Sequence, residues 1–132
     1  MALEMSSAAR ILVVDDDPRL RHILSLYLQV QRLEVVTAAN GQEGLDALSA
    51  GLPDLIITDV MMPVMDGITF CRRVRALPGA ASLPIIVFTS LDLESDLEMA
   101  QTAGADRVIT KPFSLTGLGE TVQALLPQAT AA

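Results

Sequence analysis

The polar residues of this sequence that could do chemistry come directly after short apolar runs, where strands would end. They are Asp15 and Asp16 after ILVV, Asp59 after LIIT, Thr89 after PIIVF, and Lys111 after RVIT. If these strands share one parallel sheet, their side chains meet at one edge, because open α/β sheets bind ligands beyond the carboxyl ends of the strands. Crowded carboxylates raise one another's pKa values or require a cation, and oxygen-only ligands suit Mg²⁺. The combination predicts a magnesium-assisted transfer of a phosphoryl group onto a carboxylate.

Taken one at a time, such residues have simpler interpretations. An aspartate after a strand commonly caps a helix, and Asp17, directly before Pro18, is interpreted as an N-cap rather than as a further metal ligand. A lone lysine is commonly a solvated surface charge. His22 could be taken for a phosphohistidine, but it lies in a stretch with an apolar stripe and is interpreted as structural or solvent-facing. The specificity of the prediction therefore comes from the combination.

Strand and helix patterns alternate five times along the chain and would position these side chains. The expected strands cover about residues 10–15, 34–39, 54–59, 84–88 and 106–110. The first helix begins at Pro18 and ends near Gln31, the second ends at Gly51, the third stops before Pro78, the fourth ends at Gly104, and the last carries Leu115, Leu118, Val122 and Leu125. Apolar residues at helical spacing in the first helix are Leu20, Ile23, Leu24, Tyr27 and Leu28. Near-continuous apolar strands joined by helices predict an α/β fold with a parallel sheet and right-handed crossovers.

Length and composition limit the possible functions. The 132 residues fit one domain, expected over residues 9–126, with a flexible N-terminal arm of residues 1–8 and a flexible tail of residues 127–132. The net charge of -7 argues against direct binding to nucleic acid, because neutralising phosphates requires clustered Lys and Arg.

Cys71 is the single cysteine of the sequence, which excludes an internal disulfide and fits a reducing cytoplasm. We interpret it as a small apolar residue of a helix. Neither a signal peptide nor a membrane span is expected.

Four motifs carry a resemblance to a known family. ILVVDDDP, TDVMMPVMDG, PIIVFTS and GADRVITKPF occur in this order along the chain. In order and spacing they resemble the receiver (response-regulator) domain of two-component signal transduction, over about residues 9–126. The resemblance implies a flavodoxin-like, doubly wound sheet of five parallel strands in the order 2-1-3-4-5, with helices on both faces. This order is one that the switch-point rule allows.

The resemblance also implies roles for the residues at the metal and the phosphoacceptor. Asp59 matches the phosphoacceptor of the family. Asp15 and Asp16 match the acidic pair that holds Mg²⁺ together with Asp59, and the backbone carbonyl of Met61 matches the remaining protein ligand.

Further positions match residues that contact the transferred group. Thr89 matches the hydroxyl that binds a phosphoryl oxygen, and Lys111 matches the lysine that neutralises the group. Ser90 is small enough to leave space for the phosphoryl group and can offer its backbone N–H. The bond between Lys111 and Pro112 is expected to be cis. The implied partners are a sensor histidine kinase or histidine phosphotransfer protein as donor and a downstream protein target, with no membrane partner.

Two departures from the family concern the output surface and the lifetime of the phosphoryl group. Receivers commonly carry Tyr or Phe where this sequence has Val108, so an aromatic side chain cannot report the state. Met61 and Leu91 stand two residues beyond Asp59 and Thr89, where receivers place residues that orient the attacking water. Neither side chain can orient a water, so we expect slow self-dephosphorylation.

Functions of other classes are less consistent with the sequence. A flavodoxin-like electron carrier would need a phosphate loop after the first strand, where DDDP would repel the FMN phosphate. An aspartyl phosphatase would need a second Asp two residues after the first, where Met61 stands. The alternative kept open is a degenerate receiver that binds partners without phosphorylation. We expect no conventional enzyme, but a protein that catalyses its own phosphorylation and slow dephosphorylation.

Overall fold

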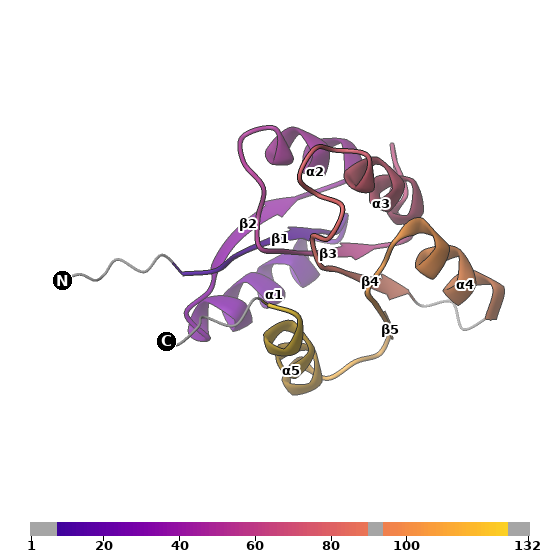
Figure 1. Ribbon diagram of the computed structural model, residues 1–132. Coiled ribbons are helices and arrows are strands. Elements are labelled where there is room, and N and C mark those ends of the chain that lie inside the picture. The colour runs from indigo at the N-terminus through magenta and orange to yellow at the C-terminus, as the bar shows by residue number, and fades with distance from the viewer. Residues whose placement is uncertain (1–7, 90–93, 127–132) are drawn as a thin grey trace.

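The computed structural model describes residues 8–89 and 94–126, and it shows a parallel sheet between two layers of helices (Figure 1). The elements in chain order are β1 (Arg10–Val14), α1 (Pro18–Val30), β2 (Glu34–Ala38), α2 (Gly41–Leu48), β3 (Leu55–Asp59), α3 (Gly67–Arg75), β4 (Ile85–Thr89), α4 (Glu94–Ala103), β5 (Arg107–Thr110) and α5 (Leu115–Leu125). The five strands lie in the order β2-β1-β3-β4-β5, and every neighbouring pair is parallel. The predicted fold and strand order are confirmed. The segments 1–7 and 127–132, in which the arm and the tail were expected, lie outside the described residues.

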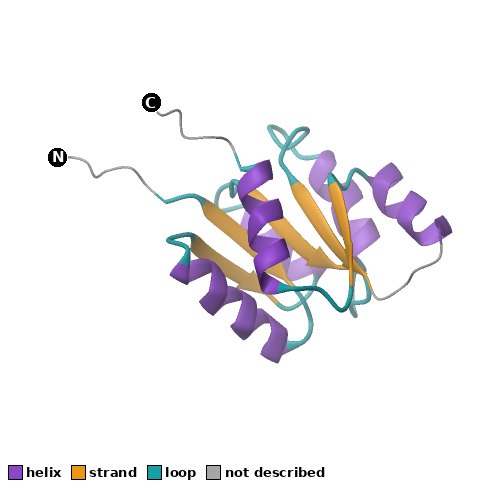
Figure 2. Cartoon of the chain, turned by 90° about the horizontal axis from the view of Figure 1, so that it is seen from below, coloured by secondary structure: helices purple, strands orange, loops and turns teal. Residues whose placement is uncertain are grey.

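The sheet separates two apolar cores. Alternation along β1 sends Ile11 and Val13 to one face and Leu12 and Val14 to the other. The first face packs against α1 and α5, which lie in front of the sheet in Figure 2. The second face packs against α2, α3 and α4, and Cys71 of α3 is fully buried there. Burial raises the pKa of the Cys71 thiol to about 12, so it behaves as the apolar core residue that the sequence predicted.

The last strand corrects the prediction that the apolar run RVIT forms a buried strand. β3 and β4 are buried along their whole length, and β1 is buried from Ile11 onward. In β5, by contrast, Val108 and Ile109 are half-buried and the strand's two end residues are exposed. The reason is positional: β5 is the last strand of the sheet, so no further strand covers its outer edge.

The first helix begins as predicted but packs along a narrower stripe. The Asp17 side chain accepts a hydrogen bond of 2.9 Å from the Arg19 N–H, which confirms its role as N-cap. Leu24 and Leu28 are buried, whereas Ile23, expected to pack on the sheet, is 47% exposed. The expectation for Ile23 was wrong because helical spacing permits a wider stripe than the sheet and α5 cover.

The loop between β3 and α3 is held by close backbone packing and contains a strained residue. Gly67 has no room for a side chain, because a Cβ would collide with the carbonyl oxygen of Asp59. Val64 has φ 70, and the Met65 N–H donates a hydrogen bond of 2.7 Å to the Pro63 carbonyl. This is a γ-turn of the rare strained kind, centred on a β-branched residue. Val64 is 79% exposed, so little packing offsets the strain.

Arg75, the last residue of α3, binds backbone segments near the amino ends of β4 and β5. Its guanidinium donates hydrogen bonds to the backbone carbonyls of Ala80, Leu83 and Gly104 at 2.6 to 3.2 Å. It also pairs with the Asp106 carboxylate at 3.0 Å. One side chain thereby joins the end of α3 to the turns before β4 and β5.

Candidate functional site

Three carboxylates converge at the carboxyl edge of the sheet. Asp15 and Asp16 follow β1, and Asp59 ends β3, which pairs directly with β1. One oxygen atom from each of the three residues lies within 4.8 Å of the others. The strand order changes direction at β1, which lies between β2 and β3. This switch point brings together the three aspartates that the sequence predicted as a cluster.

Asp15 is the most perturbed carboxylate of this cluster. It is 1% exposed, and its Oδ1 accepts a hydrogen bond of 2.9 Å from the Asp17 N–H, while its Oδ2 is buried without a hydrogen-bond partner. Burial raises the pKa of the Asp15 carboxyl to about 6, the Asp59 and Asp16 charges add to the rise, and the Asp17 N–H and Lys111 oppose it. An orphaned buried oxygen beside two further carboxylates fits a cation with oxygen ligands.

Asp59 is held in place through both of its carboxylate oxygens. Oδ1 accepts a hydrogen bond of 2.8 Å from the Val60 N–H, and Oδ2 lies 3.3 Å from Nζ of Lys111. Asp59 is 6% exposed, and the Lys111 side chain is 29% exposed. The Asp59 carboxylate therefore contacts the Lys111 ammonium through one oxygen and a backbone N–H through the other.

Lys111 and Thr89 reach the site from the two strands on the far side of β3. Thr89 ends β4 and is buried, and its carbonyl accepts a hydrogen bond of 2.8 Å from the Lys111 N–H. The peptide bond between Lys111 and Pro112 is cis, as the resemblance implied. The structure thus brings together Asp15, Asp16, Asp59, Thr89 and Lys111 at one edge of the sheet.

The remaining predicted site residues are placed differently. Met61 follows Asp59 in the β3–α3 loop, and its side chain is 61% exposed. The role of its carbonyl as a metal ligand stays a prediction. Ser90 and Leu91 lie outside the described residues.

Sequence reasoning missed two supports of this site. Nη1 of Arg21 donates a hydrogen bond of 2.6 Å to the backbone carbonyl of Asp15 and so ties α1 to the acidic cluster. The Phe113 ring stacks on Phe88 with their centroids 4.4 Å apart, which anchors the turn that follows Lys111. An aromatic residue directly after Lys-Pro was a usable signal for the second support, whereas nothing in the sequence pointed to Arg21.

An apolar hollow adjoins the site on the side of α1. Its volume is about 430 Å³, and it is lined by Arg19, Leu20, Ile23, Lys111, Pro112 and Phe113 among others. Leu26 and Val30 continue an exposed apolar stripe along α1 beyond Ile23, at 50%, 82% and 47% exposure respectively. Exposed apolar side chains at helical spacing beside a polar site are typical of a protein-binding surface.

Comparison with known proteins agrees with this geometry. The family model of the response regulator receiver domain matches residues 11–123. The response regulator MprA of Mycolicibacterium vanbaalenii is 40% identical over 121 residues, which cover 92% of this chain and 52% of MprA. The DNA-binding dual master transcriptional regulator RpaA of Synechocystis sp. is 38% identical over 118 residues, which cover 89% of this chain and 48% of RpaA. The chain therefore spans about half the length of these relatives.

A solved structure with the same fold contains the metal. The receiver domain of the sensor histidine kinase PA1611 from Pseudomonas aeruginosa PAO1, with a magnesium ion coordinated in its active site cleft, superimposes with a TM-score of 0.83. It is 28% identical, and the match covers 89% of this chain and 97% of that one.

Proposed function

Because the chain belongs to the response regulator receiver domain family, we propose that Asp59 accepts a phosphoryl group from a phosphohistidine. The observation that carries this proposal is the position of the Asp59 carboxylate. It lies 3.3 Å from the Lys111 ammonium and beside the carboxylates of Asp15 and Asp16, at the carboxyl edge of the sheet. An anionic nucleophile flanked by a cation and by a set of metal-binding oxygens suits phosphoryl transfer, in which positioning and charge stabilisation provide most of the catalysis.

The transfer forms one bond and breaks one. A carboxylate oxygen of Asp59 attacks the phosphorus atom, the P–N bond of the phosphohistidine breaks, and the leaving imidazole nitrogen keeps the bonding electrons. The product is an acyl phosphate on Asp59. The Val60 N–H, which donates to Oδ1 at 2.8 Å, restricts rotation of the carboxylate and presents Oδ2 on the side of Lys111.

The acidic cluster provides the ligands for Mg²⁺. Asp15, Asp16 and Asp59 and the backbone carbonyl of Met61 would hold the ion, and the magnesium-containing cleft of PA1611 supports this assignment. When bound, Mg²⁺ neutralises charge on the phosphoryl oxygens and relieves repulsion among the carboxylates. The unpartnered Oδ2 of Asp15 is the local feature that this assignment explains.

Lys111 and Thr89 complete the site on the β4 and β5 side. The Lys111 ammonium offsets charge on the transferred group, and the Thr89 hydroxyl and the Ser90 N–H bind its oxygens. This contact biases Thr89 toward the phosphoryl group and shifts the surface formed by α4, β5 and α5. Val108 is half-buried against the core under α4, and no aromatic rotamer at this position can report the shift.

The proposed partners are proteins. A sensor histidine kinase or histidine phosphotransfer protein would supply the phosphoryl group and cover the apolar hollow beside Lys111. A downstream protein would read the shifted surface. RpaA is named as DNA-binding, but the match to this chain covers only 48% of RpaA. With a net charge of -7 the chain itself is proposed to contact proteins rather than DNA.

In the part of the chain that the structure describes, no helix has the length and apolarity to cross a bilayer. We propose the cytoplasm as the setting.

The test is phosphorylation by a small donor. Incubation with acetyl phosphate and Mg²⁺ should add one phosphoryl group to the native chain and none to Asp59→Asn, as measured by intact-mass spectrometry. Asp54→Asn serves as a control, because Asp54 lies at the opposite edge of the sheet and binds the Arg10 N–H. Equal labelling of native chain and Asp59→Asn would refute the assignment. No labelling of the native chain would favour a degenerate receiver that binds partners without phosphorylation.

The lifetime of the acyl phosphate is expected to depend on the residue types two positions beyond Asp59 and Thr89. We propose slow hydrolysis, because Met61 and Leu91 offer no group that orients water, and such a group contributes roughly 10²-fold or more. Phosphate loss from the isolated protein should be accelerated in the double variant Met61→Asn with Leu91→Glu. Decay of the native acyl phosphate within seconds, or no acceleration in the double variant, would contradict this explanation.

A further inference from the structure

We propose that Met61 is a site of reversible oxidation to methionine sulfoxide, and that Arg72 binds the sulfoxide oxygen, so that peroxide acts on the loop following Asp59. The three features that carry the inference are the exposure of the thioether, the exposed guanidinium, and the hollow that they share.

Methionine side chains gather on one surface hollow between the β3–α3 loop, α3 and α4. The hollow measures about 390 Å³, and Met61, Met62, Met99 and Arg72 contribute to its lining. Met61 is 61% exposed and Met99 is 49% exposed. Met62 and Met65 are half-buried and pack against the core under α2, α3 and α4. Among the methionines of the described residues, peroxide therefore reaches Met61 and Met99 first.

Hydrogen peroxide is the oxidant in this step and supplies the oxygen atom that the sulfur gains. The sulfur lone pair of Met61 attacks one oxygen of hydrogen peroxide, an S–O bond forms, and the O–O bond breaks. The sulfur loses two electrons, and the departing hydroxide takes the proton from the transferred oxygen and leaves as water. The product is a polar side chain with a hydrogen-bond acceptor where a weak one stood before.

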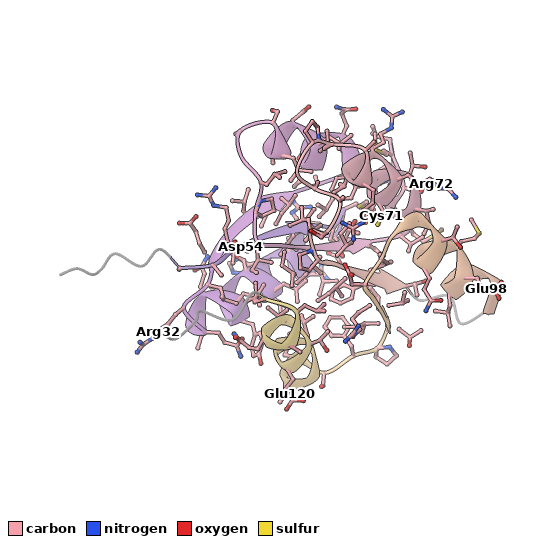
Figure 3. All side chains as sticks on the ribbon, in the orientation of Figure 1. Arg32, Asp54, Cys71, Arg72, Glu98 and Glu120 are labelled. Carbon is pink, nitrogen blue, oxygen red and sulfur yellow. The ribbon has the colours of Figure 1, made fainter. Side chains whose placement is uncertain are left out.

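Arg72 lines the same hollow as Met61, and its guanidinium can donate a hydrogen bond to the sulfoxide oxygen. It is an exposed residue of α3 and projects outward from the helix, whereas its neighbour Cys71 lies toward the sheet (Figure 3). None of the side chains that the structure describes forms a hydrogen bond or ion pair with its guanidinium. A guanidinium offers several N–H donors. Oxidation of Met61 therefore creates a hydrogen-bond acceptor on the same hollow as the guanidinium donors of Arg72.

The position of Met61 decides which part of the protein responds. Met61 lies on the loop between β3 and α3, whereas Met99 lies on α4. A sulfoxide held by Arg72 ties this loop to α3. Because the loop begins at the residue after Asp59, this contact would also restrict the backbone next to the phosphoacceptor. Only this last consequence rests on the proposed function.

The test is to treat the full chain with hydrogen peroxide and to measure two quantities that do not depend on phosphorylation. Peptide mass spectrometry should find sulfoxide at Met61 and Met99 before Met62 and Met65, and a methionine sulfoxide reductase should reverse it. Hydrogen exchange at the amides of residues 60–66 should slow by about threefold after oxidation, the size of an exposed charge-assisted contact.

Matched variants separate this mechanism from general oxidative damage. Met61→Leu and Arg72→Leu should each lose the slowing, whereas Met99→Leu and Arg73→Leu should keep it, because Arg73 lines a different hollow. Oxidation of Met61 no faster than that of Met62 would overturn the proposal. Equal slowing in Arg72→Leu and the native chain would overturn it as well.

Discussion

Replacing Asp15 by Asn should stabilise the metal-free protein at neutral pH, although it removes a residue of the proposed metal site. In the folded state the Asp15 carboxyl is buried beside the charges of Asp59 and Asp16, and its Oδ2 has no hydrogen-bond partner. Asparagine keeps the acceptor for the Asp17 N–H and replaces the orphaned oxygen by an uncharged NH₂. Burying a neutral amide costs less than burying a charged carboxylate.

The size and pH dependence of the effect follow from the raised pKa. The pKa of Asp15 rises from 3.8 to about 6 on folding, and one pKa unit corresponds to about 1.4 kcal/mol. The full shift would be about 3 kcal/mol, which we reduce to about 2 kcal/mol because the asparagine amide is itself a polar group whose burial offsets part of the gain. Since the folded-state pKa lies above the unfolded value, folding favours the protonated form. The penalty is therefore absent below about pH 4, grows between about pH 4 and 6, and is complete at pH 7.5.

Urea unfolding in chelator tests this reasoning. Asp15→Asn should exceed the native chain in free energy of unfolding by about 2 kcal/mol at pH 7.5, and by little near pH 4. Added Mg²⁺ should stabilise the native chain much more than the variant. Asp16→Asn is the matched control, and its effect should be clearly smaller because Asp16 is exposed. A variant less stable than the native chain at pH 7.5, or a difference independent of pH, would show that the buried charge does not destabilise the fold.

Other substitutions test single contacts. Gly67→Ala should lower the free energy of unfolding by about 3 kcal/mol in urea titrations, because its Cβ meets the Asp59 carbonyl; a neutral result would mean that the loop relaxes. Val64→Asn should raise the free energy of unfolding by about 1 kcal/mol, since asparagine tolerates positive φ. Arg75→Met should cost about 3 kcal/mol by the same measurement, because it leaves carbonyls and a carboxylate without their donor. Lys111→Ala should keep Mg²⁺ binding in calorimetry but slow phosphorylation by acetyl phosphate by about 10²-fold; unchanged phosphorylation would remove the lysine from the mechanism.

Much of the fold was predictable because its local signals agree with one another. The apolar runs of β1, β3 and β4, the N-cap at Asp17 and the glycines that follow helices placed most element bounds within a residue or two. The errors concern burial. Ile23 fits a packing stripe by spacing, and RVIT reads as a buried strand by composition, yet both are partly exposed. Burial depends on which neighbours cover a residue, and helical or strand periodicity does not contain that information.

By itself the sequence determined that Asp15, Asp16, Asp59, Thr89 and Lys111 follow strands of a parallel sheet, because strand ends and polar residues are local features of the chain. Tertiary structure alone decided how these groups differ from one another. The order of the strands brings one oxygen of each aspartate within 4.8 Å of the others, and the packing around the end of β1 buries Asp15 while it leaves Asp16 exposed. Contacts such as the one from Arg21 to the Asp15 carbonyl join elements whose distance is set by packing. A carboxylate's pKa and partners are properties of the space around it, and that space exists only after the strands and helices have assembled.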